Sequence, residues 1–216
     1  MKDYKFVFFD FDGTLVNTIN GTKESALYAL EHFNILVSDT ENIGNIFCGP
    51  PLRESFKKYN LNDEDIEEAI KLYRKYQVEK TVECNELYNG IEEMLTVLKE
   101  KEKKLIIVTA KLEQTAIKIL KYLDILKYFD IVVGATSDNS RVTKKEVMKY
   151  TINNIENVDL KKSIMIGDRA SDIKAGIANN MDTIGVLYGM DTRELLENAG
   201  GTYFVNRPID ILDVIK

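Results

Sequence analysis

Six short apolar runs constrain the fold of this chain more than any other feature. They are rich in β-branched and aromatic residues and lie at 4–9, 104–109, 130–134, 163–167, 183–188 and 202–205. Continuous apolarity, as opposed to alternation, is typical of strands covered on both faces. Helical patterns separate most of these runs, at 90–102, 112–126, 144–155 and 171–180. This β-α-β-α rhythm predicts an α/β fold with a doubly wound, Rossmann-like parallel sheet.

The interval from about Asn17 to Leu87 breaks this rhythm. It contains no convincing strand, and its helical patterns at 21–33, 50–59 and 62–80 begin with cap-like Asp, Asn or Pro residues. We therefore expect a core domain of residues 1–16 and 88–216 and an inserted α-helical cap domain of residues 17–87. Since the insertion follows the first strand, it should begin at the sheet edge where open α/β sheets bind ligands.

The composition excludes several classes of protein. No apolar run approaches the roughly 20 residues needed to span a bilayer, and no signal peptide is evident, so we expect a cytoplasmic protein without a membrane partner. A net charge of -6 gives no basic surface for a nucleic acid polymer. Cys48 and Cys84 fit no metal-site spacing, and the single histidine, His32, lies in a helical pattern. We expect a monomer or a weak homodimer.

Oxygen-bearing side chains follow three of the predicted strands. They are Asp10 with Asp12, Thr109, and Asp168. Parallel strands would place these junctions at one edge of the sheet, and clustered carboxylates repel one another unless a cation lies between them. Oxygen ligands without histidine or cysteine favour Mg²⁺, which often completes its coordination with substrate phosphate. The sequence therefore predicts a small phosphorylated metabolite as substrate.

A bound phosphate would need further cations and donors. Lys144 or Lys145, at a loop-to-helix junction, could neutralise its oxygens. Gly13 would allow a sharp turn after Asp12, and the nearby amides could help to hold the phosphate. Arg53 offers a forked cation for a second anionic group, although a solvated arginine in the first turn of a helix explains it equally well.

Four motifs occur in the order that they have in the haloacid dehalogenase-like phosphohydrolases. They are "DFDGT" at 10–14, Thr109 in "IIVTAK", Lys144 in "VTKKEV", and "GDRASD" at 167–172. The first motif is specific, whereas the other three gain weight only as an ordered set. The chain resembles this family over its whole core, and most closely its phosphoglycolate phosphatase-like branch, which has a helical cap.

The resemblance implies a role for each matched residue. Asp10 would attack phosphorus to form an aspartyl-phosphate, with its other oxygen on Mg²⁺. Asp12 would protonate the leaving oxygen and later accept a proton from water, with its backbone carbonyl on the metal. Asp168 would bind the metal directly. Thr109 and Lys144 would bind the transferring phosphoryl group.

Several alternatives remain open. Asp168 and Asp172 could instead cap the helix that begins near Ala170, and otherwise Asp172 would orient the lysine or metal-bound waters. The leading function is a Mg²⁺-dependent phosphatase acting on small monoesters, phosphoglycolate phosphatase-like or 5'-nucleotidase-like. A β-phosphoglucomutase-type phosphosugar mutase would use the same aspartyl-phosphate. A non-catalytic phosphate-binding regulator would be expected to have lost the nucleophile or the acid.

Overall fold

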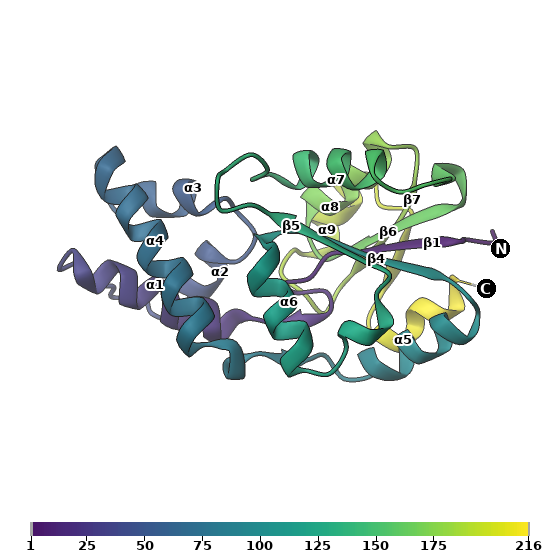
Figure 1. The fold of residues 1–216 in the computed structure, drawn as a ribbon, viewed down its shortest axis with the longest axis horizontal. Helices are drawn as coiled ribbons and strands as arrows, with labels where there is room; N and C mark the ends of the chain where they lie inside the picture. The colour runs from purple at the N-terminus through teal and green to yellow at the C-terminus, as the bar shows by residue number, and fades with distance from the viewer. Residues whose placement is uncertain (1, 216) are drawn as a thin grey trace. The chain divides into compact units, whose positions relative to one another are not determined.

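Six parallel strands form one sheet in the part of the chain that the computed structural model describes, residues 2–215 (Figure 1). They are β1 (Phe6–Phe9), β4 (Lys104–Leu112), β5 (Ile131–Ala135), β6 (Ser163–Gly167), β7 (Asp182–Val186) and β8 (Tyr203–Val205). The order β5-β4-β1-β6-β7-β8 makes the chain progress outward in both directions from β1. Each predicted apolar run contains a strand, although β4 continues past Thr109, its predicted end, and β7 ends before Tyr188. The predicted doubly wound α/β class is confirmed.

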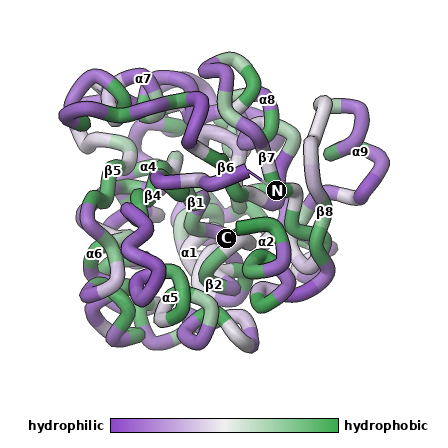
Figure 2. The backbone as a smooth tube through the Cα atoms, turned by 90° about the vertical axis from the view of Figure 1, so that its right-hand side faces the viewer, coloured by the Kyte–Doolittle hydropathy of each residue, from purple (hydrophilic) through white to green (hydrophobic). Residues whose placement is uncertain are grey.

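Helices cover both faces of this sheet, which explains why its strands are continuously apolar. Helices α7 (Lys144–Asn153) and α8 (Ala170–Ala178) contact one face, and α5 (Ile91–Glu100) and α6 (Glu113–Tyr122) lie on the other (Figure 1). All four residues of β1 are buried. Hydrophobic and hydrophilic residues alternate along α6 and α7, as expected of helices with one face on a sheet (Figure 2).

The helix boundaries follow local capping signals. Thr143 precedes α7 and forms a capping box, in which its side chain accepts from Glu146 N at 3.3 Å and its own N–H donates to Glu146 at 2.8 Å. The helix predicted at 112–126 ends earlier, at Tyr122, and a 3₁₀ turn, η2 (Leu126–Tyr128), follows. The structure adds elements that the sequence did not predict: η3 (Leu160–Lys162), α9 (Arg193–Asn198) and η4 (Pro208–Asp213).

Residues Thr18–Glu86 form a second, helical unit with its own core. It contains α1 (Ile19–His32), α2 (Ile43–Phe47), α3 (Leu52–Lys57), α4 (Asp63–Lys80) and the 3₁₀ turn η1 (Val82–Cys84). Aromatic and aliphatic side chains fill this core, with Phe47 against Phe56 at a ring-centroid distance of 4.7 Å. Helix α2 was not predicted, because its five residues are too few to show a period.

Two short strands mark where the chain leaves the sheet-containing unit and returns to it. They are β2 (Val16–Asn17) and β3 (Glu86–Leu87), which pair with each other. We expected no strand in 17–87, and two-residue strands are too short to give an alternation pattern. Among the described residues, no helix combines the length and the apolarity that crossing a membrane requires.

Candidate active site

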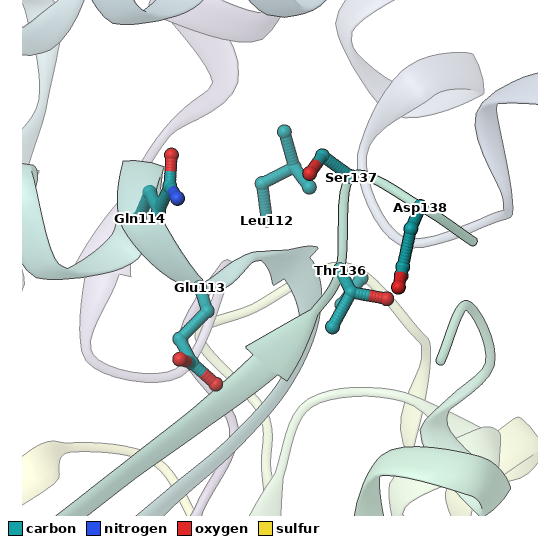
Figure 3. Close-up of a pocket in the computed structure, with 7 residues that line it drawn as sticks. Leu112, Glu113, Gln114, Thr136, Ser137 and Asp138 are labelled. Carbon is teal, nitrogen blue, oxygen red and sulfur yellow. The ribbon is translucent and has the colours of Figure 1, made fainter. Parts of the chain in front are cut away.

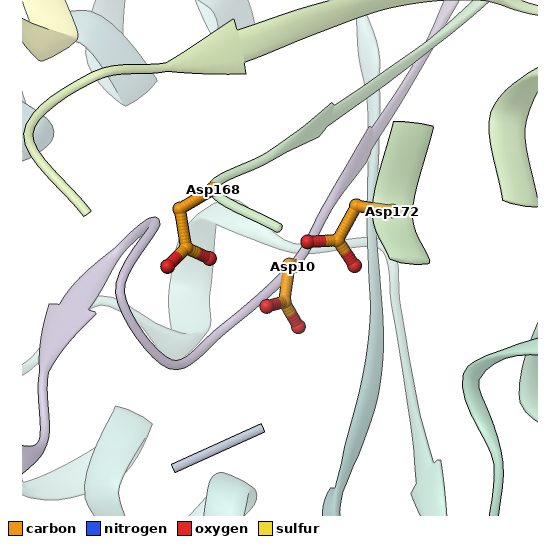
Figure 4. Close-up of side chains that lie close together, drawn as sticks. All are labelled: Asp10, Asp168 and Asp172. Atoms are coloured by element: carbon orange, nitrogen blue, oxygen red, sulfur yellow. The ribbon is translucent and has the colours of Figure 1, made fainter. Parts of the chain in front are cut away.

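Three buried carboxylates meet at the carboxyl edge of the sheet. Asp10 directly follows β1, Asp168 directly follows β6, and Asp172 lies in the first turn of α8. Parallel pairing of β1 with β6 aligns the two strand ends, and Asp10 N donates to Ile166 O at 2.8 Å. One oxygen from each carboxylate lies within 4.8 Å of the others, and Figure 4 shows the three groups facing a shared space. The predicted convergence of Asp10 and Asp168 is therefore present.

Glycines make room for these carboxylates. A Cβ atom on Gly13 would lie 2.2 Å from Asp168 Oδ2, and the φ of +81° at Gly13 is one that other residues rarely adopt. A Cβ atom on Gly189 would lie 2.2 Å from the Asp168 Cβ, and one on Gly167 would lie 2.3 Å from the Asp172 Cβ. Any side chain at these positions would displace the carboxylates, so the glycines shape the site through the space they leave.

Lys144 is the cation that contacts this cluster. Its Nζ contacts Asp10 Oδ1, lies 2.9 Å from Asp172 Oδ1, and donates to Val108 O at 2.9 Å. Lys145, the alternative left open by the sequence, is exposed. The start of α7 thus directs Lys144 toward the cluster, where its positive charge faces Asp10 and Asp172.

The ionisation of the cluster reflects its burial. Burial raises the pKa of Asp10 to about 7, opposed by the positive charge of Lys144 and reinforced by Asp172. Burial, followed by the charges of Asp10 and Asp172, raises the pKa of Asp168 well above its ordinary value. For Lys144, burial lowers the pKa, but the two carboxylates it contacts outweigh burial and hold the pKa above its ordinary value. The negative charge of the site is therefore incompletely compensated by the protein alone.

This donor set fits a hard divalent cation. It offers only carboxylate oxygens. Mg²⁺ prefers oxygen ligands, and the protein usually supplies only a few of them, with water and substrate phosphate as the others. Asp172 is already engaged on both oxygens, because Oδ2 accepts from Arg169 N at 3.0 Å and Oδ1 faces Lys144. Asp172 therefore caps α8 and orients the lysine, which combines two of the alternatives that the sequence left open.

The side chain of Asp12 lies outside the three-carboxylate cluster and pairs with Lys111. Lys111 Nζ donates to Asp12 Oδ1 at 2.9 Å, and the two side chains are only 5% and 13% exposed. Lys111 also donates its backbone N–H to Thr109 Oγ1 at 3.1 Å, so the buried threonine is tied to the same turn. Lys111 was not among the predicted site residues, although it stands two residues after Thr109 in the motif "IIVTAK".

Asp168 accepts hydrogen bonds from two residues that were not predicted as part of the site. Thr14 donates to Asp168 Oδ1 at 3.1 Å, and Met190 N donates to Oδ2 at 2.9 Å. Tyr188 in turn donates to Thr14 O at 3.0 Å. Thr14 belongs to the "DFDGT" motif, which was the available signal, whereas nothing in the local sequence distinguishes the loop that contains Tyr188 and Met190.

Arg53, predicted as a substrate-binding cation, is engaged within the helical unit. Its Nη1 lies 2.7 Å from Asp63 Oδ1, and its Nη2 contacts Glu67 Oε1. Both carboxylates belong to α4. The guanidinium fork therefore joins α3 to α4 in this structure, and its role in substrate binding stays a prediction.

A separate pocket of about 260 Å³ opens where β4 and β5 end. Figure 3 shows Glu113 and Gln114 of α6 on one side of it and Thr136, Ser137 and Asp138 on the other. None of the carboxylates of the cluster lines this pocket. The pocket and the carboxylate cluster are therefore separate features of the sheet-containing unit.

Comparisons with known proteins give a consistent family. Residues 7–186 match the family model described as haloacid dehalogenase-like hydrolase. The tyrosine-protein kinase PtkA of Mycobacterium tuberculosis (strain ATCC 25618 / H37Rv) is 30% identical over 198 residues, which are 92% of this chain and 67% of that protein. The pyrophosphatase PpaX of Halalkalibacterium halodurans is 30% identical over 210 residues, 97% of this chain and 95% of that protein. A solved structure described as a predicted phosphatase from Clostridium acetobutylicum is 37% identical, with a TM-score of 0.91, and the match covers 98% of this chain and 100% of that one.

Proposed function

This chain belongs to the haloacid dehalogenase-like hydrolases and is a phosphatase, and we propose that it hydrolyses small phosphate monoesters with Mg²⁺ through an aspartyl-phosphate on Asp10. The observation that carries the proposal is the buried cluster of Asp10, Asp168 and Asp172, whose oxygens lie within 4.8 Å of one another beside Lys144. Burying three carboxylates beside a lysine lowers the stability of the fold. This arrangement is expected where the carboxylates bind a cation and a phosphoryl group.

In the first half-reaction, a carboxylate oxygen of Asp10 forms a bond to phosphorus while the ester P–O bond breaks. Asp12 donates a proton to the departing oxygen, so the leaving group departs as a neutral alcohol. In the second half-reaction, Asp12 accepts a proton from a water molecule whose oxygen attacks phosphorus. The bond between Asp10 and phosphorus breaks and inorganic phosphate is released.

The remaining residues bind and orient the groups that react. In this proposal Lys144 offsets negative charge on the phosphoryl oxygens, and Thr109 donates a hydrogen bond to them. Asp10 and Asp168, with the backbone carbonyl of Asp12, would hold Mg²⁺, which when bound would offset the charge shared by the carboxylates and the phosphoryl group. In this proposal the inserted helical unit determines which ester is accepted. The monomeric or weakly dimeric state and the cytoplasmic location stay predictions.

The proposal is tested with a panel of phosphate esters assayed for released phosphate with and without Mg²⁺. The panel includes the esters phosphoglycolate, 5'-nucleotides and p-nitrophenyl phosphate, together with the anhydride pyrophosphate. We expect Mg²⁺-dependent release by the natural chain and none by Asp10→Asn, which retains nearly the same shape without the nucleophile. Mg²⁺-dependent turnover by Asp10→Asn would contradict the nucleophile assignment.

Two further outcomes separate the alternatives. Turnover of β-glucose 1-phosphate without release of phosphate would identify a phosphosugar mutase. Binding of phosphate esters without turnover of any of them would identify a regulator. The first outcome is measured by adding β-glucose 1-phosphate to the panel and following its conversion, and the second by measuring ligand binding alongside released phosphate.

A further inference from the structure

The loop that follows β7 contacts two segments of the candidate site that come from different strands. Residues 188–191, which we call the clamp loop, lie between β7 and α9. In this loop Met190 N donates to Asp168 Oδ2 at 2.9 Å. A Cβ atom on Gly189 would lie 2.2 Å from the Asp168 Cβ and 2.6 Å from Gly13 O, so at this point the loop touches both segments. The clamp loop therefore joins the end of β6 to the turn after β1.

Tyr188 provides a second contact between the clamp loop and the turn after β1. Its hydroxyl donates to Thr14 O at 3.0 Å, and the Thr14 hydroxyl donates to Asp168 Oδ1 at 3.1 Å. The Tyr188 ring is held separately, with its centroid 4.9 Å from that of Tyr88. Burial, followed by the negative charge of Asp168, raises the pKa of Tyr188, so the hydroxyl keeps its proton and remains a donor. A chain of two hydrogen bonds thus connects Tyr188 to the carboxylate.

These bonds restrict the orientation of the Asp168 carboxylate. One of its oxygens accepts from Thr14 and the other from Met190 N. An ionised carboxylate has about four acceptor positions, so positions remain for a cation. A carboxylate that is already oriented loses less freedom when it binds a cation, and outer partners of this kind raise the affinity of metal sites. The turn that Tyr188 contacts also contains Asp12, whose backbone carbonyl is a proposed ligand of Mg²⁺.

We propose that Tyr188 is a positioning residue for the Mg²⁺ site, which it affects through Thr14. Its hydroxyl fixes the turn after β1 against the clamp loop, so that the Asp168 carboxylate and the Asp12 carbonyl keep one orientation. The inference rests on the proposed function, because it concerns the cation of that proposal. It assigns a role to a residue that does not itself belong to the cluster of carboxylates.

The first test is Mg²⁺ binding to the full chain without substrate, measured by titration calorimetry. Tyr188→Phe removes the hydroxyl and keeps the ring beside Tyr88. Tyr122→Phe is the matched control, since it removes a hydroxyl from a tyrosine that is 51% exposed at the end of α6. We expect Kd for Mg²⁺ to rise about threefold to tenfold in Tyr188→Phe, which corresponds to about 0.6–1.4 kcal/mol, the usual net contribution of one hydrogen bond. Tyr122→Phe should bind Mg²⁺ as the natural chain does.

The second test asks whether the effect passes through Thr14. Thr14→Val removes the hydroxyl that donates to Asp168 and keeps the shape of the side chain. It should also raise Kd for Mg²⁺, and the double variant with Tyr188→Phe should raise it by less than the product of the two single factors, because both changes break the same chain of hydrogen bonds. A double variant whose factor equals that product would overturn the route through Thr14.

Two further measurements distinguish positioning from a purely structural role. The loss of hydrolysis rate in Tyr188→Phe should be largest at low Mg²⁺ and shrink as Mg²⁺ approaches saturation, and an equal loss at every Mg²⁺ concentration would contradict the inference. A tyrosine with only a structural role would lower the unfolding midpoint in EDTA and leave Kd for Mg²⁺ unchanged. That result would overturn the inference as well.

The natural chain separates a failure of this inference from a failure of the proposed function. If the natural chain binds no Mg²⁺ and hydrolyses no ester in the panel, the proposed function fails and the inference fails with it. If the natural chain binds Mg²⁺ and Tyr188→Phe binds it as tightly as Tyr122→Phe, only the inference is overturned.

Discussion

Replacing Lys144 by methionine is the sharpest test of how the carboxylate cluster is stabilised. Methionine keeps most of the length of the side chain but removes the charge that faces Asp10 and Asp172. The lysine side chain is 10% exposed and that of Asp172 is 1% exposed, so solvent cannot replace the lost cation. Removing one partner of a buried ion pair costs about 3–5 kcal/mol because a charge is left buried and uncompensated.

This loss should be visible as a large shift in unfolding without Mg²⁺. At about 2–4 °C per kcal/mol for a chain of this size, Lys144→Met should lower Tm by about 6–20 °C in EDTA at neutral pH. Lys145→Met is the matched control, since Lys145 is exposed and a surface change of this kind costs within about 0.5 kcal/mol. Circular dichroism during urea or thermal unfolding measures both.

Two further observations would complete the test. Adding Asp10→Asn to Lys144→Met should recover part of the lost stability, because it removes a carboxylate that the first change left without a cation. Mg²⁺ should stabilise Lys144→Met by a larger increment than the natural chain. A loss of less than about 1 kcal/mol for Lys144→Met, or one equal to that of Lys145→Met, would refute the reasoning from buried charge.

Three other predictions follow from the same site. Gly13→Ala should weaken Mg²⁺ binding, measured by titration calorimetry, because its Cβ would lie 2.2 Å from Asp168 Oδ2; unchanged affinity would contradict the steric argument. Lys111→Met should lower kcat most for esters with poor leaving groups, because Asp12 loses the contact that positions it, and an equal loss for all leaving groups would argue against that role. In EDTA the free energy of unfolding should fall as pH rises from about 4 to about 7, because burial raises the pKa of Asp10 to about 7 in the folded state and the unfolded chain releases that proton near 4. Asp10→Asn should remove much of this slope, and an unchanged slope would count against the buried carboxyl as its source.

Local patterns were sufficient to predict the sheet and the two residues at its edge. Strands buried on both faces need continuous apolar sequence, so all six were visible as runs, and a parallel arrangement brings Asp10 and Asp168 to one edge. The longer helices that pack on the sheet were predicted from the helical spacing of their apolar residues. Short elements such as α2 and β3 have too few residues for a period, so they were not predicted.

The sequence by itself determined the α/β class, the helical insertion and the identity of the acidic residues, because these depend on periodicity and on motifs of adjacent residues. Tertiary structure alone decided which charged side chains contact one another. It placed Lys144 rather than Lys145 against the carboxylates, paired Asp12 with Lys111 and engaged Arg53 with two carboxylates of α4. These outcomes depend on which side chains meet across distant segments and on how much water is excluded there, and a linear pattern contains neither.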